Sequence, residues 1–214
     1  TLGFGLVTLL FGGATALAVG EINTMREQTT IINDHIGPQL QSSTEAERYS
    51  RINTENVLRQ LNLTDTTKIA SLTDQTKVNR KAQLDLVSML EKEPLEKEVA
   101  PIFTELKAAD TRKAQVLDEM SSLLGQGKHD EARAYAESTF LSTSRAADDY
   151  FSKLTAALDR SLDEHTSAIE VAAQRTFTIL VIAAGLAAVA SSAIAYTIIR
   201  SVTTPINRAV NVLG

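Results

Sequence analysis

The sequence has no cysteine and no tryptophan, and aromatic residues make up only 5% of its 214 residues. Without cysteine the chain forms no disulfide and performs no thiolate chemistry, so its fold must be held together by packing. The scarcity of aromatic residues favours helix-on-helix packing over a β-sandwich. The net charge is −5 and no basic cluster is present, which argues against a nucleic acid as the partner.

The residue patterns of catalytic and metal sites are also missing. The three histidines, His35, His129 and His165, are far apart, and none is paired at a metal-ligand spacing. There is no glycine-rich phosphate loop and no nucleophile placed beside a base. We therefore expect no enzymatic activity, no metal site and no cofactor.

Charge and proline are absent from residues 176–199, an apolar run between Arg175 and Arg200. At ~1.5 Å per residue this run forms a helix of roughly 36 Å, which is enough to cross a ~30 Å hydrocarbon core. A core helix of a soluble protein is the alternative, but such helices are usually shorter and carry a polar edge. We therefore predict a transmembrane helix over residues 176–199.

A second uncharged run covers residues 1–20 and, at ~30 Å, is also about one bilayer thick. It could instead be a signal peptide, since Ala14, Ala16 and Ala18 resemble a cleavage site. The run exceeds the usual ~7–15 apolar residues of a signal peptide, which favours an uncleaved transmembrane helix. Because the chain does not begin with methionine, we expect a short cytoplasmic segment before this helix.

Glycine and proline are also scarce between these two runs, so residues 21–175 are predicted to form four long helices. The first covers residues 21–63 and bends at Gly37-Pro38, because proline removes a backbone hydrogen bond. A turn rich in capping residues, at residues 64–67, separates it from the second helix.

Pro94 ends the second helix and suits the first position of the third, although Pro101 could mark that start instead. The third helix has the clearest periodicity, with apolar residues every three or four positions and Lys113 as its one polar break. A glycine-containing turn at residues 125–127 closes it. The fourth helix then begins at residues 128–130 and continues into the second apolar run.

No strand is predicted, which makes the chain all-α. An up-down-up-down four-helix bundle, anchored by two transmembrane helices, satisfies the helix lengths because only the longer first and fourth helices must reach the membrane. The chain is thus divided into transmembrane helix 1 (1–20), a four-helix domain (21–175), transmembrane helix 2 (176–199) and residues 200–214. In the last segment we expect the helix to break at Pro205 and a new amphipathic helix to begin.

Several local motifs accompany this layout. Arg51-Ile52-Asn53 resembles the arginine-bearing part of the first bundle helix in aspartate-type receptors, and Leu124-Gly125-x-Gly127 with Glu131-Ala132 resembles the turn before the fourth helix. With the Thr204-Pro205-Ile206 junction, the whole chain resembles the sensory half of a bacterial methyl-accepting chemotaxis protein that ends in the first helix of a HAMP linker.

This resemblance implies a function and several partners. It implies a homodimeric, multi-pass receptor for signal transduction in chemotaxis, located in the bacterial inner membrane with its ligand-binding domain in the periplasm. It also implies an adaptor protein and a histidine kinase that act through a cytoplasmic region outside this sequence. The same bundle also precedes the catalytic domains of membrane histidine kinases and cyclic-nucleotide enzymes, which remain the alternative, and a two-span anchor without a ligand is a third possibility.

The resemblance also places a ligand site across the dimer interface, with arginines from the first bundle helix and hydroxyl groups from the fourth. Arg51 matches the first of these arginines, whereas Asn56 and Gln60 stand at the other two positions. Because two of the three arginines are missing, aspartate is disfavoured, and we expect another small anion such as an organic acid.

The residues themselves give independent support for this location. Arg48, Arg51 and Arg59 fall within ~80° of one another on a helical wheel, a concentration of donors suited to a carboxylate or phosphate. Counted along the helices, the hydroxyl residues of the fourth helix lie at a comparable depth. The candidate ligand-binding residues are Arg48, Tyr49, Arg51, Asn56, Arg59, Thr139, Ser142 and Thr143.

A plainer interpretation of these arginines needs no ligand. Each has a glutamate three or four residues before it, namely Glu45, Glu47 and Glu55. Such pairs form a solvated salt-bridge ladder worth a few tenths of a kcal/mol each. Tyr49, in turn, could simply be a packing residue of the bundle.

Overall fold

The computed structural model describes the backbone of residues 2–213 and the side chains of residue 5 and residues 7–202. Every element in this part of the chain is helical, which confirms the all-α prediction. The elements in order are α1 (Leu2–Ile31), η1 (Ile32–Ile36), α2 (Gly37–Gln60), α3 (Thr66–Lys92), α4 (Val99–Gly125), α5 (His129–Tyr135), η2 (Ala136–Phe140) and α6 (Leu141–Leu213), where η1 and η2 are single π-helical turns.

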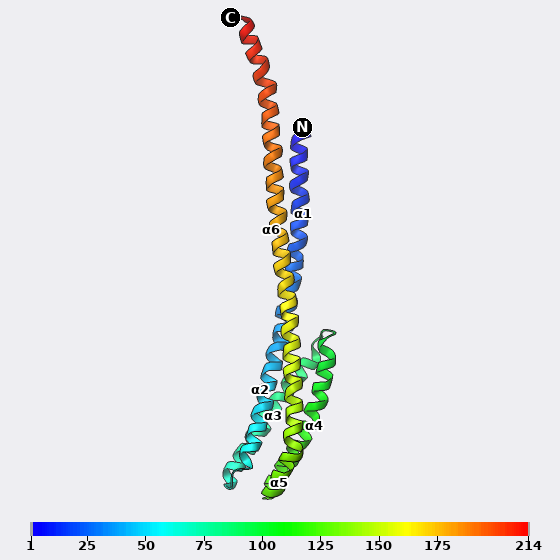
Figure 1. Ribbon diagram of the computed structural model, residues 1–214, viewed down its shortest axis with the longest axis vertical. Coiled ribbons are helices and arrows are strands. Elements are labelled where there is room, and N and C mark those ends of the chain that lie inside the picture. The colour runs from blue at the N-terminus through cyan, green and yellow to red at the C-terminus, as the bar shows by residue number, and fades with distance from the viewer. Residues whose placement is uncertain (1, 214) are drawn as a thin grey trace. The chain divides into compact units, whose positions relative to one another are not determined.

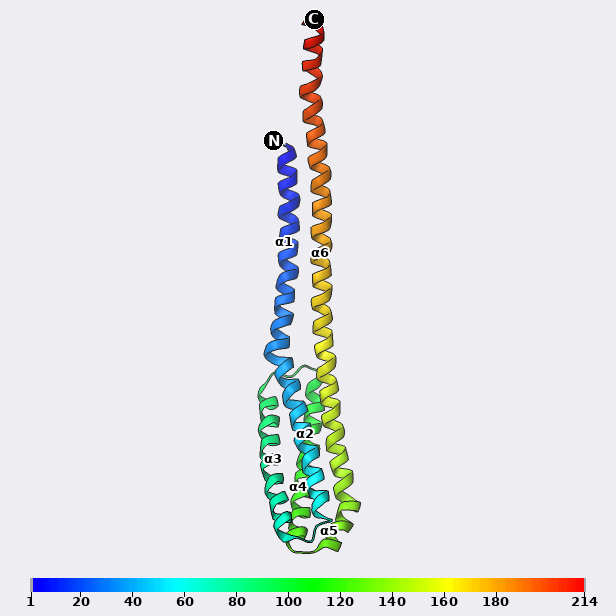
Figure 2. The ribbon, with the colours of Figure 1, turned by 90° about the vertical axis from the view of Figure 1, so that its left-hand side faces the viewer.

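The chain forms two compact units. We call Ile31–Glu164 the core unit, and Thr1–Thr30 with His165–Gly214 the apolar unit. In the core unit, α2, α3, α4 and the first part of α6 lie side by side, and α5 begins at the turn that follows α4 (Figures 1 and 2).

Two apolar clusters fill the interior of the core unit. The Phe151 cluster consists of Ala46, Val87, Leu90, Val99, Phe103, Leu106, Phe151, Leu154, Ala157 and Leu158. The Phe140 cluster consists of Val57, Leu61, Leu117, Met120, Leu124, Ala132, Ala136 and Phe140. Both clusters draw on α2, α4 and the helical segment after residue 129, so the three-or-four-residue spacing of apolar positions does mark the buried faces.

Helix α3 starts at a side-chain cap in the predicted turn. Asp65 Oδ1 accepts hydrogen bonds from the backbone N–H groups of Thr67 at 3.0 Å and Lys68 at 3.3 Å. The cap satisfies two of the donors that the first turn of a helix leaves unpaired. The helix ends at Lys92, immediately before Glu93-Pro94, as the proline predicts.

Replacing Asp65 by alanine should lower the free energy of unfolding by about 1 kcal/mol, because both cap bonds are lost. Urea unfolding followed by far-ultraviolet circular dichroism measures this change. Asp65→Asn is the matched control and should retain most of the stability, because asparagine is as good a cap as aspartate. Equal stabilities of wild type and the alanine variant would contradict the role of the cap.

The fourth helical stretch begins at His129, as predicted, but the start of α4 and the interior of the fourth stretch differ from the sequence predictions. Helix α4 begins at Val99 and not at Pro94, so Pro101 lies in its first turn, the region where proline costs no hydrogen bond. Residues 128–140 are helical, but η2 interrupts the α-helical pattern before α6 begins. Neither a late start nor a π-turn has a sequence signal as clear as that of a proline or a cap.

The predicted bend at Gly37-Pro38 takes the form of the π-turn η1. The Gly37 N–H bonds to the Ile32 carbonyl, five residues earlier, directly before Pro38. Since proline has no N–H and its ring crowds the preceding turn, a wider turn there avoids the clash. A Cβ on residue 37 would lie 3.1 Å from the Ile32 carbonyl oxygen, which explains the glycine.

The apolar unit contains two helices, α1 and the later part of α6, that lie side by side (Figures 1 and 2). Both are long and apolar enough to cross a membrane, judged by length and composition. The buried residues of this unit are alanines, Ala18, Ala172, Ala183 and Ala187, and Glu21 faces Arg175 at 3.9 Å. The break expected at Pro205 is wrong, because the backbone of α6 stays helical through this residue to Leu213. A proline removes one backbone hydrogen bond, but a helix can continue past it.

Candidate functional site

The three arginines of α2 are exposed, and two of them pair with the glutamates that the sequence suggests. Arg51 Nη2 lies 2.5 Å from Glu47 Oε1, and Arg59 Nη2 lies 3.6 Å from Glu55 Oε2. Arg48 instead stacks over the ring of Tyr49, with its guanidinium carbon 4.6 Å from the ring centroid. The salt-bridge ladder is therefore present at two of its three predicted positions. We call Arg48, Arg51 and Arg59 the arginine face of α2.

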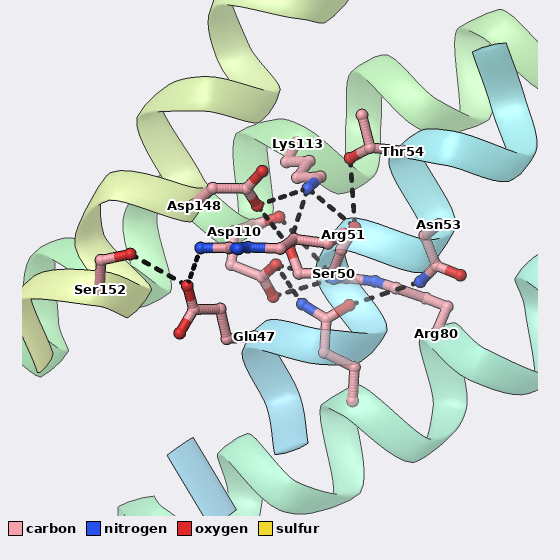
Figure 3. Close-up of polar contacts among 11 residues, drawn as sticks. Glu47, Ser50, Arg51, Asn53, Thr54, Arg80, Asp110, Lys113, Asp148 and Ser152 are labelled. Carbon is pink, nitrogen blue, oxygen red and sulfur yellow. Dashed lines mark hydrogen bonds and ion pairs between the residues drawn. The ribbon is translucent and has the colours of Figure 1, made fainter. Parts of the chain in front are cut away.

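Glu47, the ion-pair partner of Arg51 on α2, also contacts α6. The same Glu47 oxygen that binds Arg51 also accepts a hydrogen bond of 2.9 Å from the Ser152 hydroxyl on α6 (Figure 3). The Glu47 side chain is only 14% exposed, whereas that of Arg51 is 60% exposed. Because a guanidinium has five N–H donors, Arg51 keeps donors for an anion in solution.

Asn56 does not belong to the arginine face. It is 5% exposed, and its buried side-chain nitrogen has no hydrogen-bond partner among the residues that the structure describes. Gln60 is equally buried and accepts a hydrogen bond from the Thr73 hydroxyl of α3 at 3.3 Å. Asn53, Asn56 and Gln60 share a helix face by their spacing of three and four residues, and this face is the buried one. Placing Asn56 among ligand-facing residues is therefore not supported within one chain.

The hydroxyl residues of the fourth helix lie farther from Arg51 than the sequence suggests. Ser43 bonds Thr155 at 3.0 Å, and Ser50 bonds Asp148 at 2.9 Å, so residue numbers rise on α2 as they fall on α6. By this register Arg51 is level with residue 147, and Ser142 lies about 7 Å farther along the helices. The structure therefore does not bring Arg51 together with Thr139, Ser142 and Thr143 within one chain.

Ser142 and Thr143 instead line a groove between α4 and α6. The groove has a volume of about 260 Å³, and its walls are Glu105, Ala108, Ala109, Arg112, Ser142, Thr143, Ala146 and Tyr150. We call it the α4–α6 groove. Arg112 is thus the arginine that shares a cavity with the predicted hydroxyl groups, and no motif in the sequence singles it out.

A layer of buried polar residues separates the two apolar clusters, and sequence analysis missed most of it. Lys113 on α4 has a side chain only 2% exposed, and its ammonium donates to the Ser50 carbonyl at 3.1 Å and the Ser50 hydroxyl at 2.7 Å. It also donates to Asp148 Oδ1 on α6 at 3.0 Å (Figure 3). Burial lowers the pKa of Lys113, while the neighbouring Asp148 carboxylate opposes that shift.

The second part of the layer joins α3 to α4. Arg80 Nη1 donates to both oxygens of Asp110, at 2.8 and 3.0 Å, and Gln83 donates to Asp110 Oδ1 at 2.8 Å (Figure 3). Asn53 of α2 donates to Gln83 at 3.5 Å. The polar layer therefore ties all four long helices of the core unit together. Only the polar break at Lys113 indicated it in the sequence.

No protein-family model matches this chain, and no curated protein matches it. The function is therefore argued from the motifs of the sequence and from the contacts of the described residues.

Proposed function

We propose that the chain is the sensor region of a homodimeric transmembrane chemoreceptor in the bacterial inner membrane, and that it senses a small organic anion in the periplasm. An exposed arginine face on a helical unit, together with two helices apolar enough to span a bilayer, supports this function. An adaptor protein and a histidine kinase would receive the signal inside the cell.

The up-down-up-down four-helix bundle is part of this proposal. The contacts that support it have the order expected of antiparallel neighbours, in which residue numbers rise along one helix as they fall along the next. On α2 and α3, Gln39 bonds the Pro94 carbonyl and Gln60 bonds Thr73. On α3 and α4, Arg80 pairs with Asp110 and Glu91 pairs with Lys107. The contacts of Ser43 with Thr155 and of Ser50 with Asp148 have the same antiparallel order on α2 and α6.

A single observation carries the signalling function: α6 is one uninterrupted helix from Leu141 to Leu213. It contains Ser152, which is bonded to the Glu47 partner of Arg51, and it also contains the apolar run 176–199. An anion that draws Arg51 away from Glu47 would change the contact of Glu47 with Ser152, which joins α2 to α6. In the proposed mechanism α6 then shifts by ~1–2 Å, a common size for helix displacements in signalling proteins.

The proposed ligand site requires two subunits. Within one chain Arg51 and the hydroxyl groups of Thr139, Ser142 and Thr143 lie at different levels. In the proposed site the arginine face of one subunit binds the anion together with hydroxyl groups of the other subunit. Of the three arginine positions in aspartate-type receptors, only the one matched by Arg51 holds an arginine in this chain. A simple organic acid therefore suits this face better than an amino dicarboxylate.

Isothermal titration of the full chain in lipid nanodiscs with organic acids, amino acids and phosphate tests this proposal. Arg51→Ala should weaken binding of the best organic acid by at least about tenfold, because a charge-assisted bond is lost. Arg160→Ala, which removes an exposed arginine of α6 outside the site, should leave the affinity unchanged. An affinity that survives Arg51→Ala would remove this site, and no binding of any acid would remove the anion-sensing function.

A further inference from the structure

The α4–α6 groove carries opposite charges at its two ends. Glu105 and Arg112 both line it and are seven residues apart on the same face of α4. Their backbone positions are therefore ~10 Å apart along the helix. Both side chains are exposed, and neither forms an ion pair within the part of the chain that the structure describes. A small molecule in the groove thus meets a free carboxylate and a free guanidinium.

The wall of the groove that faces α4 presents different side chains to the two charged ends. Toward the tip of the core unit, the Phe140 cluster joins Phe140 to Leu117, whereas the Phe151 cluster joins Phe151 to Phe103 at the other end. Residue numbers on α4 thus rise as those on the facing helix fall. Arg112 is therefore nearer to the hydroxyl groups of Ser142 and Thr143, and Glu105 is nearer to Tyr150.

Each end offers a different type of recognition. A guanidinium beside hydroxyl groups suits a carboxylate, which accepts hydrogen bonds from both. A carboxylate beside an aromatic ring suits an ammonium group, which is attracted by the charge and by the ring face. Tyr150 already shows this behaviour, since the ammonium of Lys153 lies 4.9 Å from its ring centroid.

The middle of the groove is apolar. Ala108, Ala109 and Ala146 line it between the charged ends, and their methyl groups offer no hydrogen bond. A chain of methylene groups can therefore lie there without leaving a polar atom unsatisfied. The volume of about 260 Å³ admits a molecule of a few carbon atoms and excludes a large ligand.

We infer that the α4–α6 groove binds an aliphatic zwitterion, with its carboxylate at Arg112 and its ammonium at Glu105. Linear amino acids with the two charged groups at opposite ends of the carbon chain are the ligand class. This site goes beyond the proposed anion sensor, because its arginine is Arg112 of α4 and not one of the arginine face of α2; the two proposals have only the hydroxyl groups of Ser142 and Thr143 in common.

Isothermal titration of the full chain in nanodiscs with 5-aminopentanoate tests the inference. Pentanoate lacks the ammonium group and pentylamine lacks the carboxylate, so each should bind at least about tenfold more weakly than the zwitterion. Pentanoate that binds as tightly as 5-aminopentanoate would overturn the zwitterion assignment. No detectable binding of 5-aminopentanoate would overturn the site itself.

Variants separate this groove from the rest of the surface. Arg112→Ala and Glu105→Gln should each weaken 5-aminopentanoate by at least about tenfold, and Ala146→Phe should block it by filling the apolar middle. The matched control Arg145→Ala removes an exposed arginine outside the groove, and this variant should bind 5-aminopentanoate as the wild type does. Circular dichroism checks that every variant is folded. Unchanged affinity in both charge variants, or loss of binding in Arg145→Ala, would overturn the inference.

Discussion

Replacing Arg80 by alanine should lower the free energy of unfolding by about 3 to 5 kcal/mol, because it leaves a buried carboxylate without its cation. The partner, Asp110, has a side chain only 5% exposed and receives two bonds from the guanidinium. After the change, Gln83 is the one described side chain that still donates to the Asp110 carboxylate. Urea unfolding of the full chain in a mild detergent, followed by circular dichroism, measures the loss.

A matched control exists on the same helix. Lys77 pairs with Asp74 at 3.5 Å, but both side chains are about three-quarters exposed, so Lys77→Ala should change the stability by less than about 0.5 kcal/mol. Adding Asp110→Asn to Arg80→Ala should restore part of the stability, because the buried charge is then removed. An Arg80→Ala variant that is no less stable than Lys77→Ala would show that the pair does not hold α3 to α4.

These two changes distinguish the interior of the core unit from its surface. The interior does not consist of one continuous apolar core, since the polar layer lies between the Phe140 and Phe151 clusters. Buried ion pairs of this kind are weak evidence for high stability but are very sensitive to loss of one partner. Helix pairing in this unit therefore depends on matched charges as well as on apolar packing.

The positions of helices could be predicted from the sequence where a single residue dictates the backbone. Asp65 caps α3, Pro94 follows its end, and Gly127, with a φ of 72°, follows the end of α4. The start of α4 at Val99 could not be predicted, because no cap marks it. The π-turn η2 has no distinctive composition either.

The arrangement of side chains around the candidate site was harder to predict than the helices. The Glu47–Arg51 pair follows from a spacing of four residues on one helix, and it is present. The burial of Asn56 and the approach of Arg112 to Thr143 depend on how helices far apart in the sequence pack. Periodicity shows which face of a helix is apolar, but it does not show which neighbour that face meets or at what level.

The second large effect concerns Asp148, the partner of the buried Lys113. Asp148→Ala should lower the free energy of unfolding by about 3 kcal/mol at neutral pH, because the ammonium then lacks its counter-charge. Asp149→Ala is the matched control one residue along, since Asp149 pairs with Lys153 at the surface. It should cause only a small fraction of this loss.

The loss in Asp148→Ala should shrink as the pH rises, and the sign follows from the pKa of Lys113. Burial holds this pKa below its ordinary value of 10.5, so the unfolded chain binds the proton more tightly than the folded chain. The contribution of Lys113 to the free energy of unfolding therefore increases as the pH rises from the lowered pKa toward 10.5. The Asp148 carboxylate raises the pKa of Lys113, so removing Asp148 lowers this pKa further. The pH range over which stability increases with pH then becomes wider.

Unfolding in urea at neutral pH and at about pH 10 measures this dependence, with wild type and Asp149→Ala compared at each pH. The stability difference between Asp148→Ala and the control should be clearly smaller at the higher pH, because the lowered pKa makes the folded chain lose the Lys113 proton before the unfolded chain does. Lys113→Met removes the titrating group, so adding Asp148→Ala to it should give a difference that no longer changes with pH. A pH-independent loss in Asp148→Ala alone would mean that Asp148 acts through its bond to Ser50 and not through the charge of Lys113.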